Sequence, residues 1–437
     1  MRTFGVLQPT FAIESLMDIC SEKLGIDPIE LRMINGMKDG AVTHTRQVLG
    51  KVAYTETLKK CSEIAGWEVG SSRVRGSVRK DIKGSQIAEP YIPGKEFKSE
   101  EAMKLCRDRF KYGRGVGTGW YGIGRCATID KAGAFVEIDD GGTAMILTGV
   151  SEIGEGILTV LTQIAADELG MYPEDITIGD NDTARVPEAA HVGASRQTYM
   201  IGNAVCNACR DVKKKFIREM AAYWNIDSSS ICMKNRRIYV EGNAQYNLSL
   251  KEAVDICKKV RGIVPLGSGT YTAHHEGLDP VDGRGNPWQA YVFGTQIAEV
   301  AVDTFTGEVH VLGIWAAHDV GRVINPRGVE GQIEGGAVQS MGQTIMENYV
   351  LSEGVPTNKN FAKYILPTSV DVPEIHSYLV EERDPFSPVG AKGIGEPAPL
   401  PTAPAIVNAI YDAVGVRITS LPAIPEKILN EISKMKN

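Results

Sequence analysis

The sequence has no apolar run that reaches the ~18 residues needed to cross a bilayer, which argues against a membrane-spanning helix. It also has no long Lys/Arg run, and its formal net charge is −7, so its charge pattern does not favour a nucleic-acid partner. The first residues do not show the pattern of a secretory signal. We therefore expect a cytoplasmic protein with no membrane span and no nucleic-acid partner.

Grouped metal ligands are lacking as well. The eight cysteines are scattered, and only Cys206 and Cys209 have a CxxC spacing, with no second pair to complete a metal site. We interpret that pair as two small buried residues one helical turn apart rather than a redox or metal pair. The seven histidines show neither HxxxH nor HExxH spacing. We expect no metal ion that is held by protein side chains alone.

What the chain has in abundance is glycine next to small polar or charged residues. The segment 151–156, Ser-Glu-Ile-Gly-Glu-Gly, precedes a helix expected from Leu158 to Leu169. A glycine loop that opens a helix presents backbone N–H groups and the positive dipole end to an anion such as phosphate. The spacing is neither GxGxxG nor GxxxxGK[ST], so the segment supports neither a Rossmann turn nor a P-loop.

A second small-polar cluster, residues 193–198, precedes a helix expected around Ala204 to Met220. Its hydroxyl groups, amide and guanidinium are able to hydrogen-bond a polar ring system and a phosphate. The alternative is helix capping together with one surface arginine. The sequence leaves both interpretations open.

The third segment, Gly390–Pro397, places Glu396 between glycines and a proline. Glycines allow close approach of the backbone to a ligand because no Cβ intervenes. Thr402 and Pro404 predict a capped helix start directly after this loop, so Glu396 is expected on a loop held by a buried helix. A catalytic carboxylate is one interpretation. A solvated glutamate in a Gly-Pro turn is the other.

The coarse organisation is α+β, because strands in hairpins occur together with separate helices. Three helices are expected in residues 1–69, and their abrupt apolar start suggests a segment that completes the core of another chain. Residues 70–111 have the composition of a linker or surface excursion. Residues 112–437 form a second domain, which begins with alternating glycines at 113–119 that predict a strand closely approached by another backbone.

Several segments, in order and spacing, resemble the molybdenum hydroxylase family, which includes xanthine dehydrogenase, aldehyde oxidase and nicotinate dehydrogenase. The resemblance covers nearly the whole chain, less clearly residues 70–111 and 225–262. The segments that carry it are Arg2–Gly5 with Gln8, Gly149–Gly156, Gly193–Arg196 with Thr198, Asp319–Arg322 with Asn325 and Pro326, Gly331 and Gln332 with Gly335 and Gln339, and Gly393–Pro397. It implies molybdopterin-binding domains of the xanthine oxidase type.

The resemblance also implies roles for individual residues. Glu396 matches the catalytic base, which takes a proton from a molybdenum-bound hydroxyl group while the substrate is hydroxylated. Phe4 resembles an aromatic residue that packs against the substrate ring. The residues matched to segments that contact the pterin cofactor, its phosphates or the oxo and dithiolene groups are Arg2, Ile153, Gly154, Glu155, Gly156, Ala194, Ser195, Arg196, Thr198, Gln339, Gly393, Ile394 and Gly395.

The implied function is a molybdenum-dependent hydroxylase or dehydrogenase acting on an N-heteroaromatic such as a purine or nicotinate. The implied cofactor is molybdenum with molybdopterin, in the cytosine dinucleotide form. The family's iron–sulfur and flavin segments are absent from this sequence, so a [2Fe-2S] subunit and an FAD subunit are expected as partners, with a chain that carries the first half of the molybdenum subunit. Aldehyde oxidation on the same cofactor and a non-catalytic scaffold are the alternatives.

One residue departs from the family pattern. Glu155 stands where many relatives carry glutamine. A carboxylate beside a phosphate-bearing cofactor repels it unless the carboxylate is protonated or turned away. The contact expected at Glu155 therefore depends on the state of that side chain.

Overall fold

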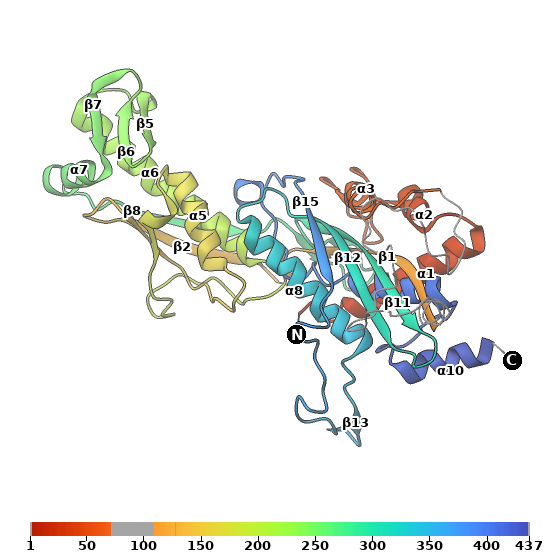
Figure 1. The fold of residues 1–437 in the computed structure, drawn as a ribbon. Helices are drawn as coiled ribbons and strands as arrows, with labels where there is room; N and C mark the ends of the chain where they lie inside the picture. Colours follow the sequence, from red (N-terminus) through yellow and green to blue (C-terminus); the bar gives the residue numbers. More distant parts are fainter. Residues whose placement is uncertain (1, 71–108, 127, 436–437) are drawn as a thin grey trace, which may run out of the picture.

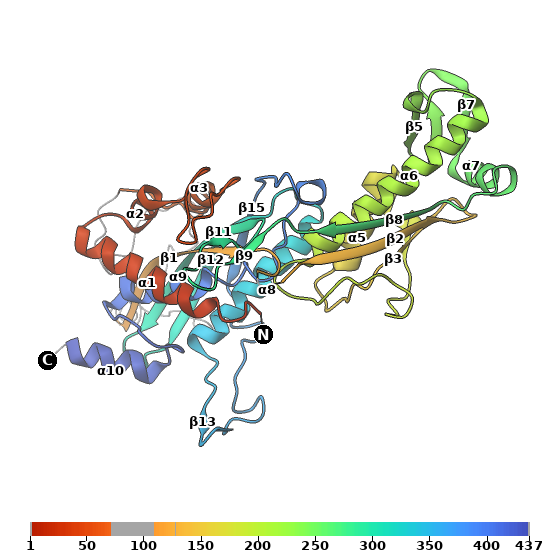
Figure 2. The same ribbon diagram turned by 180° about the vertical axis from the view of Figure 1, so that it is seen from behind.

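The computed structural model describes residues 2–70, 109–126 and 128–435. These residues form an elongated molecule in which two four-stranded sheets follow one another and a small three-stranded sheet forms one end (Figures 1 and 2). Helices pack on the sheets, and most strand pairs are antiparallel. The expected α+β class is confirmed.

The first sheet has the strand order β1-β11-β12-β15, and only the last pair, β12 with β15, is parallel. Helix α9 covers one face of β1 and β11, whereas α3 covers the opposite face. The elements of this part are α1 (Leu7–Leu24), α2 (Pro28–Asn35), α3 (Tyr54–Ile64), β1 (Phe110–Gly122), β11 (Tyr291–Asp303), β12 (Val309–Asp319), α8 (Pro326–Ile345), β15 (Glu374–Val380), α9 (Thr402–Val414) and α10 (Pro425–Met435).

Alternate glycines in β1 explain how α9 lies so close to the sheet. A Cβ added at Gly113 or Gly115 would lie 2.2 Å from a carbonyl oxygen of α9, and at Gly117 it would lie 2.3 Å from the carbonyl oxygen of Pro401. Since no side chain fits there, only glycine permits this contact. The predicted close approach of another backbone is confirmed. It fixes α9, and with it the loop that carries Glu396.

The second sheet has the order β4-β3-β2-β8, with α5 and α6 packed on it. Gly267 and Gly269 of β8 lie against the backbone of α6 in the same way. Cys206 and Cys209 are buried in α6, which confirms their interpretation as core residues. The elements are β2 (Lys131–Ile138), β3 (Ala144–Leu147), α5 (Ile157–Leu169), β4 (Ile176–Ile178), α6 (Gly202–Trp224) and β8 (Leu266–Thr272).

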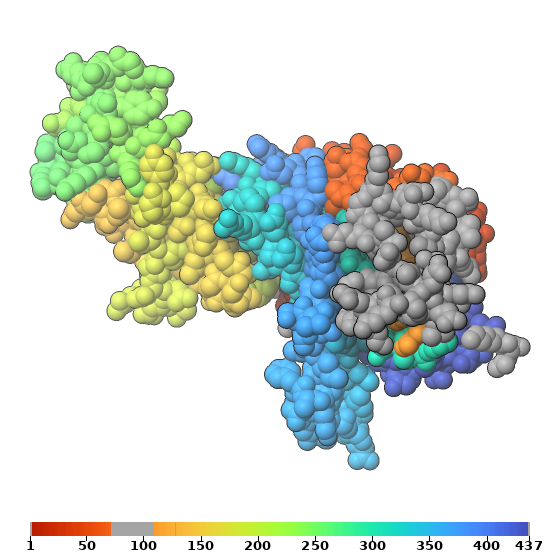
Figure 3. Space-filling model, in the orientation of Figure 1, coloured from red at the N-terminus to blue at the C-terminus, as the bar shows by residue number. Residues whose placement is uncertain are grey.

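Two smaller parts project from the sheets. A knob at one end stands apart in the space-filling view, and an arm of residues 347–373 extends from the middle of the molecule (Figure 3). The knob contains β5 (Ile231–Lys234), β6 (Arg237–Val240), β7 (Asn243–Ser249) and α7 (Leu250–Asp255), the arm contains β13 (Leu351–Ser352) and β14 (Val355–Pro356), and a short ladder joins β9 (Glu276–Leu278) to β10 (Gly285–Asn286).

Two local expectations are corrected. Thr402 does not cap α9: it is the first helical residue, and its hydroxyl group donates to Gln296 Oε1 at 2.6 Å because the residue is buried against β11. Strand β1 begins at Phe110, inside the segment expected as a linker; residues 71–108 of that segment lie outside the described residues.

None of the described helices is both long and apolar enough to cross a membrane.

Helix α1 buries its polar side. Glu14, Asp18 and Ser21 are its buried residues, and Glu14 forms a 2.9 Å ion pair with the fully buried Arg32. Its apolar residues Ile13 and Leu16 are 58% and 59% exposed. Within the described part of the chain, α1 therefore presents an apolar outer face.

Candidate active site

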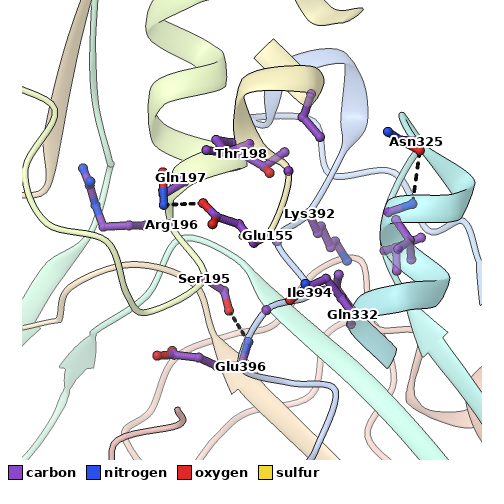
Figure 4. Close-up of a pocket in the computed structure, with 18 of the residues that line it drawn as sticks. Glu155, Ser195, Arg196, Gln197, Thr198, Asn325, Gln332, Lys392, Ile394 and Glu396 are labelled. Atoms are coloured by element: carbon purple, nitrogen blue, oxygen red, sulfur yellow. Dashed lines mark hydrogen bonds between the residues drawn. The ribbon is translucent and has the colours of Figure 1, made fainter. Parts of the chain in front are cut away.

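A cavity of about 630 Å³ lies where the two sheets meet. Its walls come from the N-terminal residues, the 153–157 loop, the 192–198 segment, the start of α8 and the 391–396 loop (Figure 4). Apart from Ala194, every residue predicted for the site lines this cavity. Segments separated by up to about 390 residues in the chain are thus brought together in one place.

The 390–396 loop is held against the end of β12 by backbone and side-chain contacts. Lys392 N donates to Val320 O at 2.9 Å, and Arg322 N donates to Gly390 O at 2.8 Å. Lys392 Nζ forms a 2.7 Å ion pair with Asp319 Oδ2, and both side chains are buried. Burial raises the pKa of Asp319 to about 6 against the opposing effect of the Lys392 ammonium group. The loop is therefore fixed from within the protein.

Glu396 itself is only 7% exposed, so the interpretation as a solvated glutamate is wrong. Its backbone N donates to Ser195 Oγ at 2.9 Å, as Figure 4 shows. Its carboxylate oxygen Oε2 accepts a hydrogen bond from the hydroxyl group of Tyr121 in β1. Within the described residues, no cation lies within ion-pair distance of Glu396. The carboxylate is shielded from bulk solvent without being neutralised by direct contact, which suits a general base.

Arg2 binds Gly395, the residue directly before Glu396. Its Nε donates to Gly395 O at 2.5 Å, and its Nη2 donates to Gln332 O in α8 at 3.1 Å. Burial lowers the pKa of Arg2, an effect that the charge of Glu396 partly offsets. Arg2 therefore links the N-terminal residues to both the 390–396 loop and α8, and places positive charge beside the cavity.

The N-terminal segment and the 193–195 segment meet under backbone strain. Thr3, Phe4, Ala194 and Ser195 all have positive φ values, between 51° and 77°, which side-chain-bearing residues rarely adopt. A Cβ on Gly193 would lie 3.4 Å from the ring of Phe4, which is 69% exposed at the cavity. Strain of this kind persists where surrounding contacts fix the backbone, and it gathers at functional sites.

The 151–156 loop differs from the expectation of free N–H groups. Glu152 Oε1 accepts from Gly154 N at 2.8 Å and from Gly156 N at 2.9 Å, and Glu152 Oε2 accepts from Leu158 N at 3.2 Å. These hydrogen bonds lower the pKa of Glu152, although burial alone would raise it. The anion at the start of α5 is thus the chain's own carboxylate, because a side chain a few residues away reaches these donors first.

Glu155 faces the cavity and is engaged by protein donors. Gln197 Nε2 donates to Glu155 Oε1 at 2.8 Å, a contact marked in Figure 4, and Ile153 N donates to Glu155 Oε2 at 2.8 Å. Burial, and then the neighbouring Glu152, raise the pKa of Glu155. The net effect makes the charged form of Glu155, which a nearby phosphate would repel, less favourable than it is in water.

Arg196 is fully buried, so the interpretation as a surface arginine is wrong. Its guanidinium forms a 2.8 Å ion pair with Asp130 and donates to the carbonyl oxygens of Lys131, Ala189 and His191. In Figure 4 its side chain extends away from Lys392. The guanidinium therefore holds the 189–196 segment in place, and a contact of Arg196 with a ligand would involve its backbone.

Sequence reasoning assigned no individual role to four residues at the site: Tyr121, Gln197, Gln332 and Lys392. Gln197, Gln332 and Lys392 lie inside segments that the sequence analysis names, and the structure adds which partners their side chains meet. Tyr121 has no local signal, because its contact with Glu396 spans 275 residues. Its place next to the glycine-rich strand is the one indication that β1 runs toward the site.

The cavity fits the cofactor that the resemblance implies. Gln197 Oε1 is a buried acceptor without a hydrogen-bond partner in the described structure, and a Cβ at Gly154 or Gly156 would meet no atom within 4 Å. Arg2 and Arg322 supply positive charge, and Gln332 and Gln339 supply amides. A polar ring with an anionic group has partners here. In residues 2–70, 109–126 and 128–435, no cluster of three or more His, Cys, Asp or Glu is arranged to hold a metal ion.

Comparisons with known proteins agree with this arrangement. Two profiles described as molybdopterin cofactor-binding domains match residues 92–373 and residues 1–36. The xanthine dehydrogenase molybdenum-binding subunit of Escherichia coli O157:H7 is 29% identical over 99% of this chain and 53% of its own length. The 6-hydroxypseudooxynicotine dehydrogenase complex subunit gamma of Paenarthrobacter nicotinovorans is 31% identical over 98% of this chain and 51% of its own length.

Among solved structures, the aldehyde oxidoreductase of Desulfovibrio gigas matches with a TM-score of 0.76 and 27% identity. The match covers 99% of this chain and 41% of that one. The chain spans about half the length of the curated relatives it matches.

Proposed function

We propose a function from one premise: the chain belongs to the family of molybdopterin cofactor-binding domains, whose profile matches more than half of it. In our proposal it is part of a molybdenum-dependent hydroxylase or dehydrogenase that inserts water-derived oxygen into an N-heteroaromatic substrate such as a purine or nicotinate. The observation that carries the proposal is the buried carboxylate of Glu396, held at the wall of a 630 Å³ cavity. The relatives named for xanthine and for a pyridine derivative support the substrate class.

When bound, molybdopterin supplies a redox-active metal that accepts two electrons from the substrate. The chain's own residues prepare the site for this chemistry. Glu396 accepts a proton at its carboxylate as oxygen is transferred, and its low exposure limits exchange with bulk water. Gln339, Gln332 and the backbone of 393–395 line the cavity where hydrogen bonds to the cofactor are expected. We expect Phe4, which is exposed and lines the cavity, to pack against an aromatic substrate.

The cofactor form and the partner subunits belong to the same proposal. We assign the cytosine dinucleotide form of molybdopterin, with a [2Fe-2S] subunit and an FAD subunit as the electron path, in a cytoplasmic complex. Residues 1–69 contribute to the first molybdenum-binding domain and residues 112–437 form the second. The exposed apolar residues Ile13 and Leu16 of α1 would contact the polypeptide that carries the rest of the first domain. The separate profile match of residues 1–36 supports this division.

The decisive test is the variant Glu396→Gln in the complete purified complex. We expect kcat for hydroxylation of the heteroaromatic substrate to fall by about 10²–10⁴-fold, since an amide does not accept the proton. Molybdenum and pterin content should remain at the wild-type level, because the amide has nearly the same shape. Glu308→Gln is the matched control: this exposed residue directly precedes β12, at the opposite end of the strand from Asp319. Full activity of loaded Glu396→Gln enzyme would refute the assigned role.

The same preparation distinguishes the alternatives. The similarity to an aldehyde oxidoreductase structure favours aldehydes as the second substrate class to assay. Faster turnover of aldehydes than of purines or pyridines would replace the N-heteroaromatic assignment. A complex free of molybdenum, pterin, iron and flavin would point to a scaffold instead.

A further inference from the structure

Tyr121 is the second-to-last residue of strand β1, just before the chain leaves the sheet. Its side chain is largely buried, at 8% exposure, and strand pairing places it opposite Val292 of β11. Its hydroxyl group donates to Oε2 of Glu396. Tyr121 is not among the predicted site residues, although it makes the one hydrogen bond to the side chain of Glu396 found in the described residues.

Different contacts hold the main chain and the side chain of Glu396. Ser195 binds the backbone N of Glu396, and Arg2 binds the carbonyl oxygen of Gly395, so both fix the main chain. Neither restricts rotation of the glutamate side chain. The one hydrogen bond to that side chain within the part of the chain that is described comes from Tyr121, which binds Oε2 and leaves Oε1 without a donor.

We propose that Tyr121 is the positioning residue of the base: it holds Oε2 and thereby turns Oε1 toward the cavity, where the proton is accepted. This inference rests on the proposed function of Glu396. A carboxylate with both oxygens free would sample several rotamers, and a small misplacement of a reacting group is costly to rate. A donor on one oxygen selects a single orientation.

The surroundings keep Tyr121 a donor. Burial, followed by the hydrogen bond and charge of Glu396, raises the pKa of Tyr121 above the ordinary value of 10.0, so its hydroxyl group stays protonated over the working range. The backbone of β1 at this point is paired to β11 on one side and touches Trp288 at Gly122, which leaves little freedom for the strand to shift. The donor is therefore preorganised.

The test is Tyr121→Phe in the complete complex, which removes one oxygen and keeps the ring. We expect kcat to fall by about 10–100-fold with KM within about twofold of wild type, because substrate binding does not involve the hydroxyl group. Molybdenum and pterin content and the thermal midpoint should stay near wild type. Tyr291→Phe is the matched control: it removes the hydroxyl of a tyrosine on the neighbouring strand, which donates to Gln47 at 2.6 Å instead. It should leave kcat unchanged.

A crystal structure of the complex gives a readout independent of turnover. In the wild type, Tyr121 should bind one oxygen of Glu396, and in Tyr121→Phe the glutamate side chain should occupy more than one rotamer. An unmoved carboxylate, a different donor on Oε2, or a loss confined to KM would overturn the inference. If Glu396→Gln is inactive and Tyr121→Phe is normal, only the role of Tyr121 fails. If Glu396→Gln is fully active, the proposed function fails as well.

Discussion

Two glycine-rich loops line the same cavity, and each precedes a helix, yet they are stabilised in different ways. The 390–396 loop is buried, and residues distant in sequence hold it: Asp319, Ser195 and Arg2. The 151–156 loop is largely exposed, and its own Glu152 binds its backbone donors. Two similar glycine-rich sequences thus form different loops. The 390–396 loop is held by residues distant in sequence, whereas the 151–156 loop is capped by its own Glu152.

The difference follows from burial. A buried backbone must find hydrogen-bond partners inside the protein, so the 390–396 loop is tied to β12, α8 and the 193–195 segment. An exposed loop has water available, and a nearby carboxylate at the positive end of α5 is sufficient. The first arrangement suits a catalytic group that must not move. The second leaves a loop whose contacts are able to exchange with those of a ligand.

The largest expected loss of stability comes from removing the buried ion pair that holds the 390–396 loop. Lys392→Met leaves Asp319 buried and unpaired, which should lower the free energy of unfolding by about 3–5 kcal/mol. Urea unfolding of the purified complex, followed by far-UV circular dichroism, measures the change. Lys51→Met, which breaks an exposed pair with Glu382, is the control and should cost about 0–1 kcal/mol. Equal effects of the two variants would contradict the role given to the buried pair.

A smaller effect is expected at the self-capped loop. Glu152→Ala removes the acceptor for three backbone N–H groups at the start of α5, and water replaces it because the loop is exposed. The free energy of unfolding should fall by about 1 kcal/mol, as for loss of a helix cap. Glu241→Ala, in an exposed turn of the knob, should have no measurable effect in the same experiment. A loss as large as that of Lys392→Met would show that the two loops are held alike.

The smallest effect concerns cofactor retention. The pKa of Glu155 is raised by burial and by Glu152, so the side chain gains its negative charge as pH rises, above the usual range for glutamate. Wild-type enzyme should therefore lose molybdopterin more readily at neutral pH, where Glu155 is ionised, than at the acidic pH at which it is protonated. Glu155→Gln should remove this pH dependence and keep the contact with Gln197. The pH dependence of molybdopterin loss is measured as pterin content per chain after dialysis at each pH. A loss that rises more steeply with pH in Glu155→Gln than in the wild type would rule out charge repulsion at this position.

Much of the fold and of the site was predictable because the signals are local. Alternating glycines in 113–117 indicated close backbone packing, and the glycine–glutamate loop before an apolar helix indicated a held carboxylate. The capping by Glu152 was also within reach, since a carboxylate just before a helix start is a recognised cap. The expectation of free N–H groups is wrong because Glu152 accepts hydrogen bonds from three of them.

Residue types and spacing thus determined the α+β class, the family and the main segments that line the cavity, since turns, strand periods and helix starts depend on neighbours in sequence. Only the tertiary structure decided which side chains meet. The pairing of Tyr121 with Glu396 and of Lys392 with Asp319, and the inward turn of Arg196 toward Asp130, depend on strand register and on burial that excludes water. Those are properties of the packed chain, and no local pattern encodes them.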